Sequence, residues 1–387
     1  MIRDPETFAA FLDTLRRFVA ERLVPRERDV SDADAIPEPV VREMRTLGLF
    51  GLSIAEEYGG LGLTMEEETL AVLELGRTSP AFRSAFGSNV GIGSQGLVLA
   101  GTPEQKAAWL PKLASGDVVA SFALTEPDAG SDAASLRTRA ERAGDGDGYR
   151  INGTKRYITN APEAGLFTVM ARTGAEGSGA DGISAFLIPA ATPGLAVGAP
   201  DRKMGQRGAH TADVVLTDCR VPAASLLGRE GEGFRIAMRV LDKGRLHIAA
   251  LCTAMAERML EDALRYALDR RQFGQRIADF QLVQAMLADS RTECLAARSM
   301  VVETARRRDA DEDVGLDASC CKLFASEMCG RVADRAVQIF GGAGYIEDYG
   351  IERFYRDARL FRIYEGTSQI QQLVIARGMI RRAQASD

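Results

Sequence analysis

Apolar residues near the N-terminus recur with the period of an α-helix. Phe8, Leu12, Leu15 and Val19 are three or four residues apart, so they lie on one side of a helix as a single stripe. A stripe of this kind is buried when the helix packs on a core. We therefore expect residues 1–118 to form a helical domain.

Two positions in this region carry the signals of a helix start. Glu67 follows Thr64 by three residues, which is the spacing of a capping box. Thr102 directly precedes Pro103, as an N-cap residue precedes a proline in the first turn. Helices are therefore predicted to begin just after Thr64 and just after Thr102.

The pattern changes at about residue 119. Short runs rich in β-branched and aromatic residues, such as 167–170, 183–188 and 213–216, are separated by clusters of glycine. Short runs bounded by glycine are typical of β-strands joined by turns. Residues 119–232 are therefore predicted to form a middle β domain, a barrel or a sandwich.

From residue 233 to 387 the helical period returns in long runs. Proline is absent from residue 223 onward, so no proline interrupts these runs. Long uninterrupted helices suit a bundle. The predicted fold class is an α+β multidomain chain: a helical domain (1–118), a β domain (119–232) and a domain like a four-helix bundle (233–387).

Length and charge narrow the classes of protein that the chain can form. Its 387 residues suffice for two to three domains of about 150 residues each. The formal charge of −6, from 54 acidic and 48 basic residues, provides no basic surface for nucleic acid. No stretch approaches the ~20 apolar residues of a membrane-spanning helix. Residues 1–23 lack the apolar run of a signal peptide.

Cysteine and histidine usage limits the metal and disulfide chemistry. The six cysteines are scattered without Cys-x-x-Cys spacing, which is typical of reduced thiols in a cytoplasmic protein. The only histidines, His210 and His247, are too few for a histidine-based metal cluster. We expect a cytoplasmic protein without a metal site.

Residues 91–96 match the Gly-x-Gly-x-x-Gly pattern of dinucleotide-binding loops. That pattern needs a preceding strand and a surrounding βαβ unit, whereas these residues lie in a region predicted to be helical. We therefore interpret the glycines as sites of close helix packing or of open space in a pocket.

Three polar segments are more specific: 124–132 (Leu-Thr-Glu-Pro-Asp-Ala-Gly-Ser-Asp), 155–160 (Lys-Arg-Tyr-Ile-Thr-Asn) and 364–371 (Tyr-Glu-Gly-Thr-Ser-Gln-Ile-Gln). Taken singly, the first segment is as readily explained by a turn that ends in a helix cap as by a binding site. The second is as readily explained by a strand with a polar end. Together and in this order, with residues 338–342 (Gln-Ile-Phe-Gly-Gly) before the third, they resemble the acyl-CoA dehydrogenase family over nearly the whole chain.

The resemblance has specific implications for structure and function. It implies the same helical, β and helical order, with FAD bound without a Rossmann fold. It also implies oxidation of an acyl-CoA thioester to a trans-2-enoyl-CoA, with electrons passed to electron-transfer flavoprotein. The family is usually a tetramer arranged as a dimer of dimers.

A flavin site needs hydrogen-bond donors for the ring, an apolar wall and a clamp for the pyrophosphate. In the family, the residue matching Thr125 bonds the isoalloxazine ring, and those matching Tyr157 and Thr159 form the aromatic wall and a hydroxyl near N5. Many members carry tryptophan where Tyr157 stands. The other FAD contacts implied in these segments are Phe122, Leu124, Gly130, Ser131, Ile158, Thr367 and Gln369.

The resemblance further implies a pyrophosphate clamp that crosses a subunit interface. Arginine presents a fork of donors suited to phosphate, and glycine lets the backbone approach it. Without the neighbouring motif, Arg270 reads as a solvated helix residue. The clamp residues implied are Arg270, Phe273, Phe280, Gln281, Gln338, Gly341 and Gly342.

Substrate contacts follow from the same segments. The residues implied are Ser131, Asp242, Arg245, Tyr364 and Gly366. A side chain in place of Gly366 would crowd the thioester. His210 follows a segment, 203–208, that matches the neighbourhood of the CoA channel, and we interpret it as a partly exposed loop histidine rather than a catalytic one.

Removal of a weakly acidic α-proton needs a carboxylate base and donors for the charge that develops on the carbonyl. Glu365 matches the family's base, and its backbone N–H is one expected donor. A minority branch carries the base at the position of Gly244, where glycine cannot serve. In a desolvated pocket, the pKa of Glu365 is expected to lie above its ordinary value.

Arg83 leaves the substrate class open. Residues 82–85 (Phe-Arg-Ser-Ala) resemble the glutaryl-CoA dehydrogenase branch, in which this arginine binds the distal carboxylate of the acyl chain. That branch carries glutamate seven residues earlier, where Gly76 stands in this chain. The alternative is that Arg83 caps a helix or pairs at the surface.

Two other functions compete with a dehydrogenase. Related acyl-CoA oxidases carry a long C-terminal extension, whereas this chain ends soon after Glu365. Flavoproteins of the alkylation response associate with nucleic acid, and the net charge and the presence of Glu365 argue against that class. A dehydrogenase is therefore the favoured interpretation.

Overall fold

The computed structural model describes residues 1–143, 148–175 and 177–385. The N-terminal part is helical, and its helices are α1 (Pro5–Phe18), α2 (Glu27–Ala33), α3 (Glu38–Thr46), α4 (Met65–Leu75), α5 (Pro80–Val90), α6 (Gln95–Ala100) and α7 (Pro103–Ser115). Capping boxes at Thr64 and Thr102 confirm both predicted helix starts.

The middle of the chain folds into an eight-stranded sheet. Its strands are β1 (Val119–Ala123), β2 (Arg139–Arg142), β3 (Tyr149–Thr159), β4 (Ala164–Arg172), β5 (Ile183–Pro189), β6 (Leu195–Val197), β7 (Thr211–Val221) and β8 (Leu226–Leu227). The order is β6-β7-β3-β2-β4-β5-β8, and β1 pairs parallel to β4. The parallel pairing places β1 beside β4, so the segment that leaves β1 at Leu124 starts next to a strand of the sheet.

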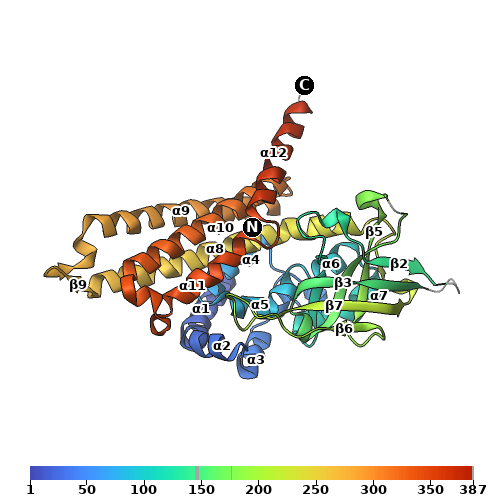
Figure 1. Ribbon diagram of the computed structural model, residues 1–387, viewed down its shortest axis with the longest axis horizontal. Helices are drawn as coiled ribbons and strands as arrows, with labels where there is room; N and C mark the ends of the chain where they lie inside the picture. Colours follow the sequence, from blue (N-terminus) through green and yellow to red (C-terminus); the bar gives the residue numbers. More distant parts are fainter. Residues whose placement is uncertain (144–147, 176, 386–387) are drawn as a thin grey trace.

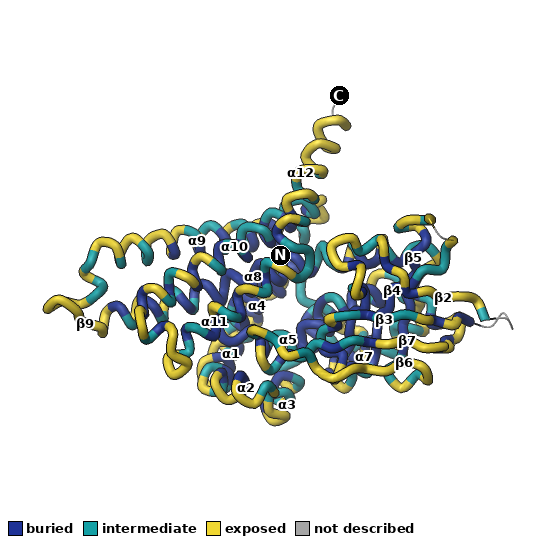
Figure 2. The backbone as a smooth tube through the Cα atoms, in the orientation of Figure 1, coloured by how far each residue is buried: buried dark blue, intermediate teal, exposed yellow. Residues whose placement is uncertain are grey.

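The C-terminal part is a bundle of long helices. They are α8 (Gly233–Asp269), α9 (Gln281–Asp309), α10 (Gly315–Phe340), α11 (Ile351–Ala358) and α12 (Ser368–Gln384), with the short strands β9 (Arg271–Gln272) and β10 (Gln275–Arg276) between α8 and α9. Figure 1 shows α8, α9 and α10 side by side and α12 projecting away from them. Figure 2 shows that this projecting helix is exposed over most of its length.

Helix α8 connects the two halves of the molecule. Its first part packs against β5 and α6, and its later part contacts α4, α9 and α10 (Figure 1). Small side chains such as Ala249, Ala250 and Ala254 are fully buried and let the neighbouring helices approach closely. The rigid helix therefore fixes the position of the bundle relative to the sheet.

The glycines of residues 91–96 have the roles predicted for them. A Cβ atom on Gly93 would lie 2.8 Å from the carbonyl oxygen of Ala120 on β1, so glycine is needed for close packing. Gly91 lines the cavity described below. The segment joins α5 to α6, with no strand before it, which confirms that it is not a dinucleotide-binding loop.

Two further observations concern the whole of the described chain. Among residues 1–143, 148–175 and 177–385, no helix combines the length and apolar character needed to cross a bilayer. The same residues contain no group of three or more histidine, cysteine, aspartate or glutamate side chains placed to hold a metal ion.

Candidate active site

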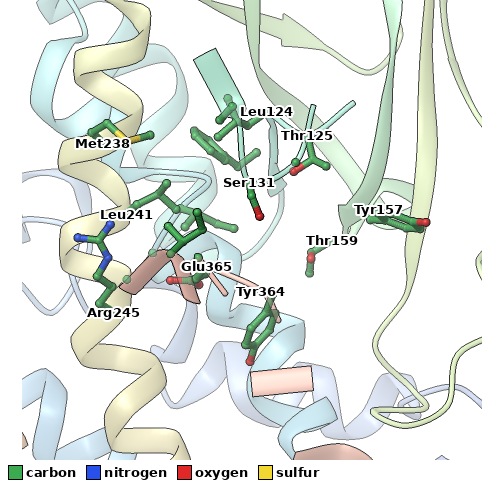
Figure 3. Close-up of a pocket in the computed structure, with 18 of the residues that line it drawn as sticks. Leu124, Thr125, Ser131, Tyr157, Thr159, Met238, Leu241, Arg245, Tyr364 and Glu365 are labelled. Carbon is green, nitrogen blue, oxygen red and sulfur yellow. The ribbon is translucent and has the colours of Figure 1, made fainter. Parts of the chain in front are cut away.

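A cavity of about 350 Å³ lies where α5, α8, the sheet and the segment before α12 meet. Figure 3 shows Met238, Leu241 and Arg245 of α8 on one side, and Tyr157 and Thr159 of β3 on the other. The sequence-predicted residues that the cavity brings together are Arg83, Phe122, Leu124, Thr125, Gly130, Ser131, Tyr157, Ile158, Thr159, Arg245, Tyr364, Glu365 and Gly366.

Glu365 lies in the turn between Arg362 and α12, with its backbone in the left-handed region (φ +52°). One carboxylate oxygen, Oε2, is buried and has no hydrogen-bond partner among the described residues. Burial raises the pKa of the Glu365 carboxyl, as expected, and the charges of Arg83, Lys322 and Arg245 oppose that rise. A carboxylate that lacks partners in a cavity is poised to accept a proton from a ligand.

Gly244 of α8 faces this carboxylate. A Cβ atom on Gly244 would lie 2.3 Å from Oε2 of Glu365, which is closer than two such atoms can approach. The absence of a side chain at residue 244 therefore leaves the space that Glu365 occupies. The two positions at which the resemblance allows a base, residues 244 and 365, are therefore neighbours across this cavity.

Two buried side chains hold the turn that carries Glu365. Lys322 of α10 donates a hydrogen bond from Nζ to the carbonyl oxygen of Gly366 (2.6 Å), and Gln371 of α12 donates from Nε2 to that of Glu365 (3.1 Å). Thr367 caps α12 through its contact with the N–H of Ile370. The turn is thereby fixed from both flanking helices.

The N–H groups of the same turn remain available. Neither Glu365 nor Gly366 donates its backbone N–H to a described residue. Because their carbonyl oxygens are already bonded to Gln371 and Lys322, the turn presents donors to a ligand without leaving buried acceptors unpaired.

The loop after β1 is anchored by a buried ion pair. Lys155 of β3 is fully buried, and its Nζ lies 2.7 Å from Oε1 of Glu126 and 3.3 Å from the carbonyl oxygen of Leu124. Glu126 also accepts from the N–H groups of Arg137 and Thr138. Burial lowers the pKa of Lys155 to about 8 despite the neighbouring Glu126. The pair fixes the segment that contains Thr125.

Three hydroxyl groups face the cavity from the sheet side: those of Thr125, Ser131 and Thr159. None of them has a hydrogen-bond partner in the part of the chain that the structure describes. Tyr157 next to them has a left-handed backbone (φ +57°) and a ring that is 59% exposed. The opposite wall is apolar, with Phe234, Met238 and Leu241. Donors opposite an apolar wall suit a flat heteroaromatic ring.

Asp242 and the clamp residues do not line this cavity. Asp242 contacts the cavity residue Arg245 through an ion pair. Arg270, Phe273, Phe280 and Gln281 lie around β9 at the far end of the bundle, and Phe273 is 93% exposed (Figure 1). Gln338, Gly341 and Gly342 lie at the end of α10, Thr367 caps α12, and Gln369 is exposed on it. Their contacts with FAD stay a prediction.

His210 lies outside the cavity and ties the middle of the chain to the N-terminal helices. Its Nε2 atom lies 2.7 Å from the carbonyl oxygen of Asp34, and its Nδ1 atom contacts Glu163. Burial by itself would lower the pKa of His210, but the bonds to Glu163 and Asp34 outweigh it and raise the pKa. The interpretation as a partly exposed loop histidine is confirmed.

Sequence reasoning missed Lys322 and Gln371, as well as the pair of Glu126 and Lys155. Lys322 lies in a helix of mixed composition, where lysine is ordinarily solvated. The signal that could have found it is its setting on the apolar face of α10, with Ala318 and Ala325 one turn away on either side.

Family models match three consecutive parts of the chain. Residues 5–117 match the N-terminal domain of acyl-CoA dehydrogenase, residues 121–219 the middle domain and residues 231–380 the C-terminal domain. A Bacillus subtilis protein named probable acyl-CoA dehydrogenase YngJ is 43% identical over 95% of this chain and 97% of its own length.

Solved structures agree over nearly the whole length. Butyryl-CoA dehydrogenase from Megasphaera elsdenii superposes with a TM-score of 0.93 at 35% identity, covering 98% of this chain and 100% of the other. A glutaryl-CoA dehydrogenase in complex with glutaryl-CoA gives 0.92 at 32% identity, covering 98% and 96%. A Bacillus anthracis acyl-CoA dehydrogenase complexed with FAD gives 0.92 at 33% identity, covering 99% and 69%.

Fold and site thus define a flavoprotein oxidoreductase that acts on a carbon–carbon single bond. The chain belongs to the acyl-CoA dehydrogenase family. The predicted fold class is confirmed, and so is FAD as the cofactor of the class. The residues present fit that cofactor. Hydroxyl donors and an apolar wall enclose the cavity, and neither these hydroxyls nor Oε2 of Glu365 has a hydrogen-bond partner within residues 1–143, 148–175 and 177–385.

Proposed function

We propose that Glu365 is the general base that removes the α-proton of an acyl-CoA thioester. The observation that carries the proposal is its buried Oε2 atom, which has no hydrogen-bond partner among the residues that the structure describes and lies in a cavity that Gly244 leaves open. FAD, when bound, supplies the acceptor for the β-hydrogen, which leaves as hydride. Loss of the proton and the hydride leaves a trans-2-enoyl-CoA.

The N–H of Glu365 stabilises the charge that develops on the thioester carbonyl. Two observations support this role. The N–H of Glu365 donates to no residue in the described part of the chain, and hydrogen bonds fix the carbonyl oxygens of the same turn. Donors that are oriented in advance act in a site with little water, where each is worth more than in solution. Ser131 and Arg245 contribute to binding of the CoA part, and Asp242 holds Arg245.

A panel of acyl-CoA thioesters tests the proposal. We expect the flavin absorbance of the FAD-loaded protein to bleach anaerobically when butyryl-, hexanoyl-, octanoyl-, isovaleryl- or glutaryl-CoA is added. The thioester that reduces the flavin fastest indicates the substrate class. Oxygen consumption during turnover in air would indicate the oxidase alternative. A flavin that none of the panel reduces would contradict the proposal.

A second candidate function is a dehydrogenase for acyl-CoA with a distal carboxylate. Arg83 of α5 lines the cavity, forms no ion pair with a described residue, and has a buried Nε atom without a hydrogen-bond partner. The charge of Glu365 reaches this guanidinium without forming an ion pair with it, so a ligand carboxylate is a further suitable partner. Gly76 departs from the glutaryl-type pattern, because the glutamate of that branch is absent there.

Replacing Arg83 with alanine distinguishes the two candidates. If the substrate carries a distal carboxylate, the variant should lose turnover of glutaryl-CoA by at least about tenfold, which corresponds to a charged hydrogen bond of 1.5–3 kcal/mol. Turnover of butyryl-CoA, measured at a pH at which Glu365 is ionised in both proteins, should change little. The measurement is kcat/KM for both thioesters in wild type and variant. If the order of preference is unchanged and the wild type does not turn over glutaryl-CoA, the distal-carboxylate substrate is rejected. The substrate is then a monocarboxylic acyl-CoA.

We also propose a tetramer whose subunits share the FAD clamp. Support comes from Arg270 and Phe273, which lie away from the cavity of their own chain, and from the 93% exposure of the Phe273 ring. Aromatic residues are enriched at interfaces between subunits. Multi-angle light scattering with flavin absorbance should show FAD only in the oligomer. A flavin-loaded monomer at micromolar concentration would reject the shared clamp.

Electron-transfer flavoprotein is the electron acceptor that we propose, on the basis of the family resemblance. A cytoplasmic location is proposed from the cysteines. All six are free in the structure, although oxidising compartments favour pairing.

A further inference from the structure

Lys322 of α10 carries a buried charge that has no role in the reaction proposed above. Its side chain is fully buried, and no carboxylate of the described residues pairs with it. Burial lowers the pKa of its ammonium group, while Cys252 and Glu365 raise it. Burying an unpaired ammonium is costly, so its presence calls for a role that compensates.

The contacts of Lys322 lead directly to the catalytic turn. Its Nζ atom donates to the carbonyl oxygen of Gly366 at 2.6 Å, next to the residue that carries the base. Both Glu365 (φ +52°) and Gly366 (φ +90°) have left-handed backbones, which few residues adopt without support. Gln371 supplies the second bond, to the carbonyl oxygen of Glu365.

The charges that face Glu365 come from three helices. Arg83 projects from α5, Arg245 from α8 and Lys322 from α10. Arg245 is paired with Asp242, whereas Arg83 and Lys322 form no ion pair with a described residue. The carboxylate of Glu327, like that of Glu365, acts on Lys322 through its charge. The phenol of Tyr364 and the thiol of Cys252 lie beside them.

We propose that Lys322 is a positioning residue that holds the Glu365 turn and, through its charge, keeps the base ionised at neutral pH. The inference rests on the proposed function of Glu365. Gln371 holds the same turn but carries no charge. Comparing substitutions at Lys322 and at Gln371 therefore distinguishes the effect of positioning the turn from the effect of the charge. Lys322 touches the backbone of the turn and acts on the substrate only through Glu365.

Lys322→Gln is the main test, because glutamine can still donate to the carbonyl oxygen of Gly366 but carries no charge. The rate of flavin reduction is measured anaerobically against pH with the fastest thioester of the panel. The acid limb of this profile, where the rate falls as Glu365 becomes protonated, should move up by about one pH unit. That is the lower end of the effect of a nearby charge. At pH values below the limb, the rate should fall about tenfold, as one pKa unit implies.

Two further variants serve as controls. Lys322→Arg keeps the charge and should keep the acid limb at the wild-type pH, even if the larger side chain lowers the maximal rate. Gln371→Met removes a bond to the turn without removing a charge, so it should lower the maximal rate and leave the limb in place. Equal limbs in Lys322→Gln and wild type would overturn the electrostatic role.

Direct titration of the carboxyl group separates this inference from the proposed function. The infrared band of the Glu365 carboxylate, identified by its loss in Glu365→Gln, can be followed against pH in the FAD-loaded protein without turnover. Its midpoint should be about one pH unit higher in Lys322→Gln. An unchanged midpoint contradicts the inference, whereas failure of every thioester to reduce the wild type contradicts the proposed function alone.

Discussion

Replacing Glu365 with glutamine is expected to lower the rate of flavin reduction by acyl-CoA by at least about a hundredfold, the lower end of general-base effects. Glutamine has nearly the same shape, so the turn held by Lys322 and Gln371 should persist. FAD and acyl-CoA should therefore still bind. Stopped-flow absorbance gives the reduction rate, and the spectral shift on adding thioester gives the affinity.

Glu57→Gln is a matched control for this variant, since Glu57 is exposed and is not among the residues that line the cavity. It should reduce its flavin at the wild-type rate. Near-normal reduction in Glu365→Gln would show that another group takes the proton. Gly244, which faces the same space, provides no alternative base.

Lys155→Met should be the most destabilising of the single substitutions considered for the site. It leaves Glu126 buried without its cation, and removing one partner of a buried ion pair costs about 3–5 kcal/mol. The loop with Thr125 loses its anchor, so FAD retention should fall as well. Denaturant unfolding of the apoprotein and the ratio of flavin to protein absorbance measure the two effects separately.

The double variant Lys155→Met with Glu126→Gln is the control for that prediction. A neutral glutamine can keep accepting from the N–H groups of Arg137 and Thr138, so the double variant should recover part of the lost stability. If Lys155→Met is as stable as the wild type and retains FAD, the pair does not anchor the loop.

The helical and β regions could be predicted because their apolar patterns are long and local. The stripe of α1, with Leu15 buried, and the capping boxes at Thr64 and Thr102 need only neighbouring residues to form. The cavity is different, because residues 124–131, 157–159 and 364–366 meet only through the packing of the sheet on α8. No spacing rule connects them, and the family resemblance supplied the connection.

Contacts that depend on tertiary structure escaped the sequence altogether. The backbone angle of Glu365 and the bond from Lys322 to Gly366 involve elements far apart in the chain. The burial of Lys155 opposite Glu126 likewise depends on β3 lying beside the segment that follows β1. A charged residue within an apolar run, such as Lys155 or Lys322, is a weak indication of a buried charge. Its contacts become known only from the folded structure.

The proximity of Gly244 to Glu365 restricts how this enzyme can change over generations. A side chain at residue 244 would overlap the Glu365 carboxylate, since even a Cβ atom there lies 2.3 Å from Oε2. A second carboxylate on α8 would therefore displace the Glu365 carboxylate from its present position. Transfer of the base to the helix disturbs the existing base from the first substitution onward, so the two positions cannot change independently of each other.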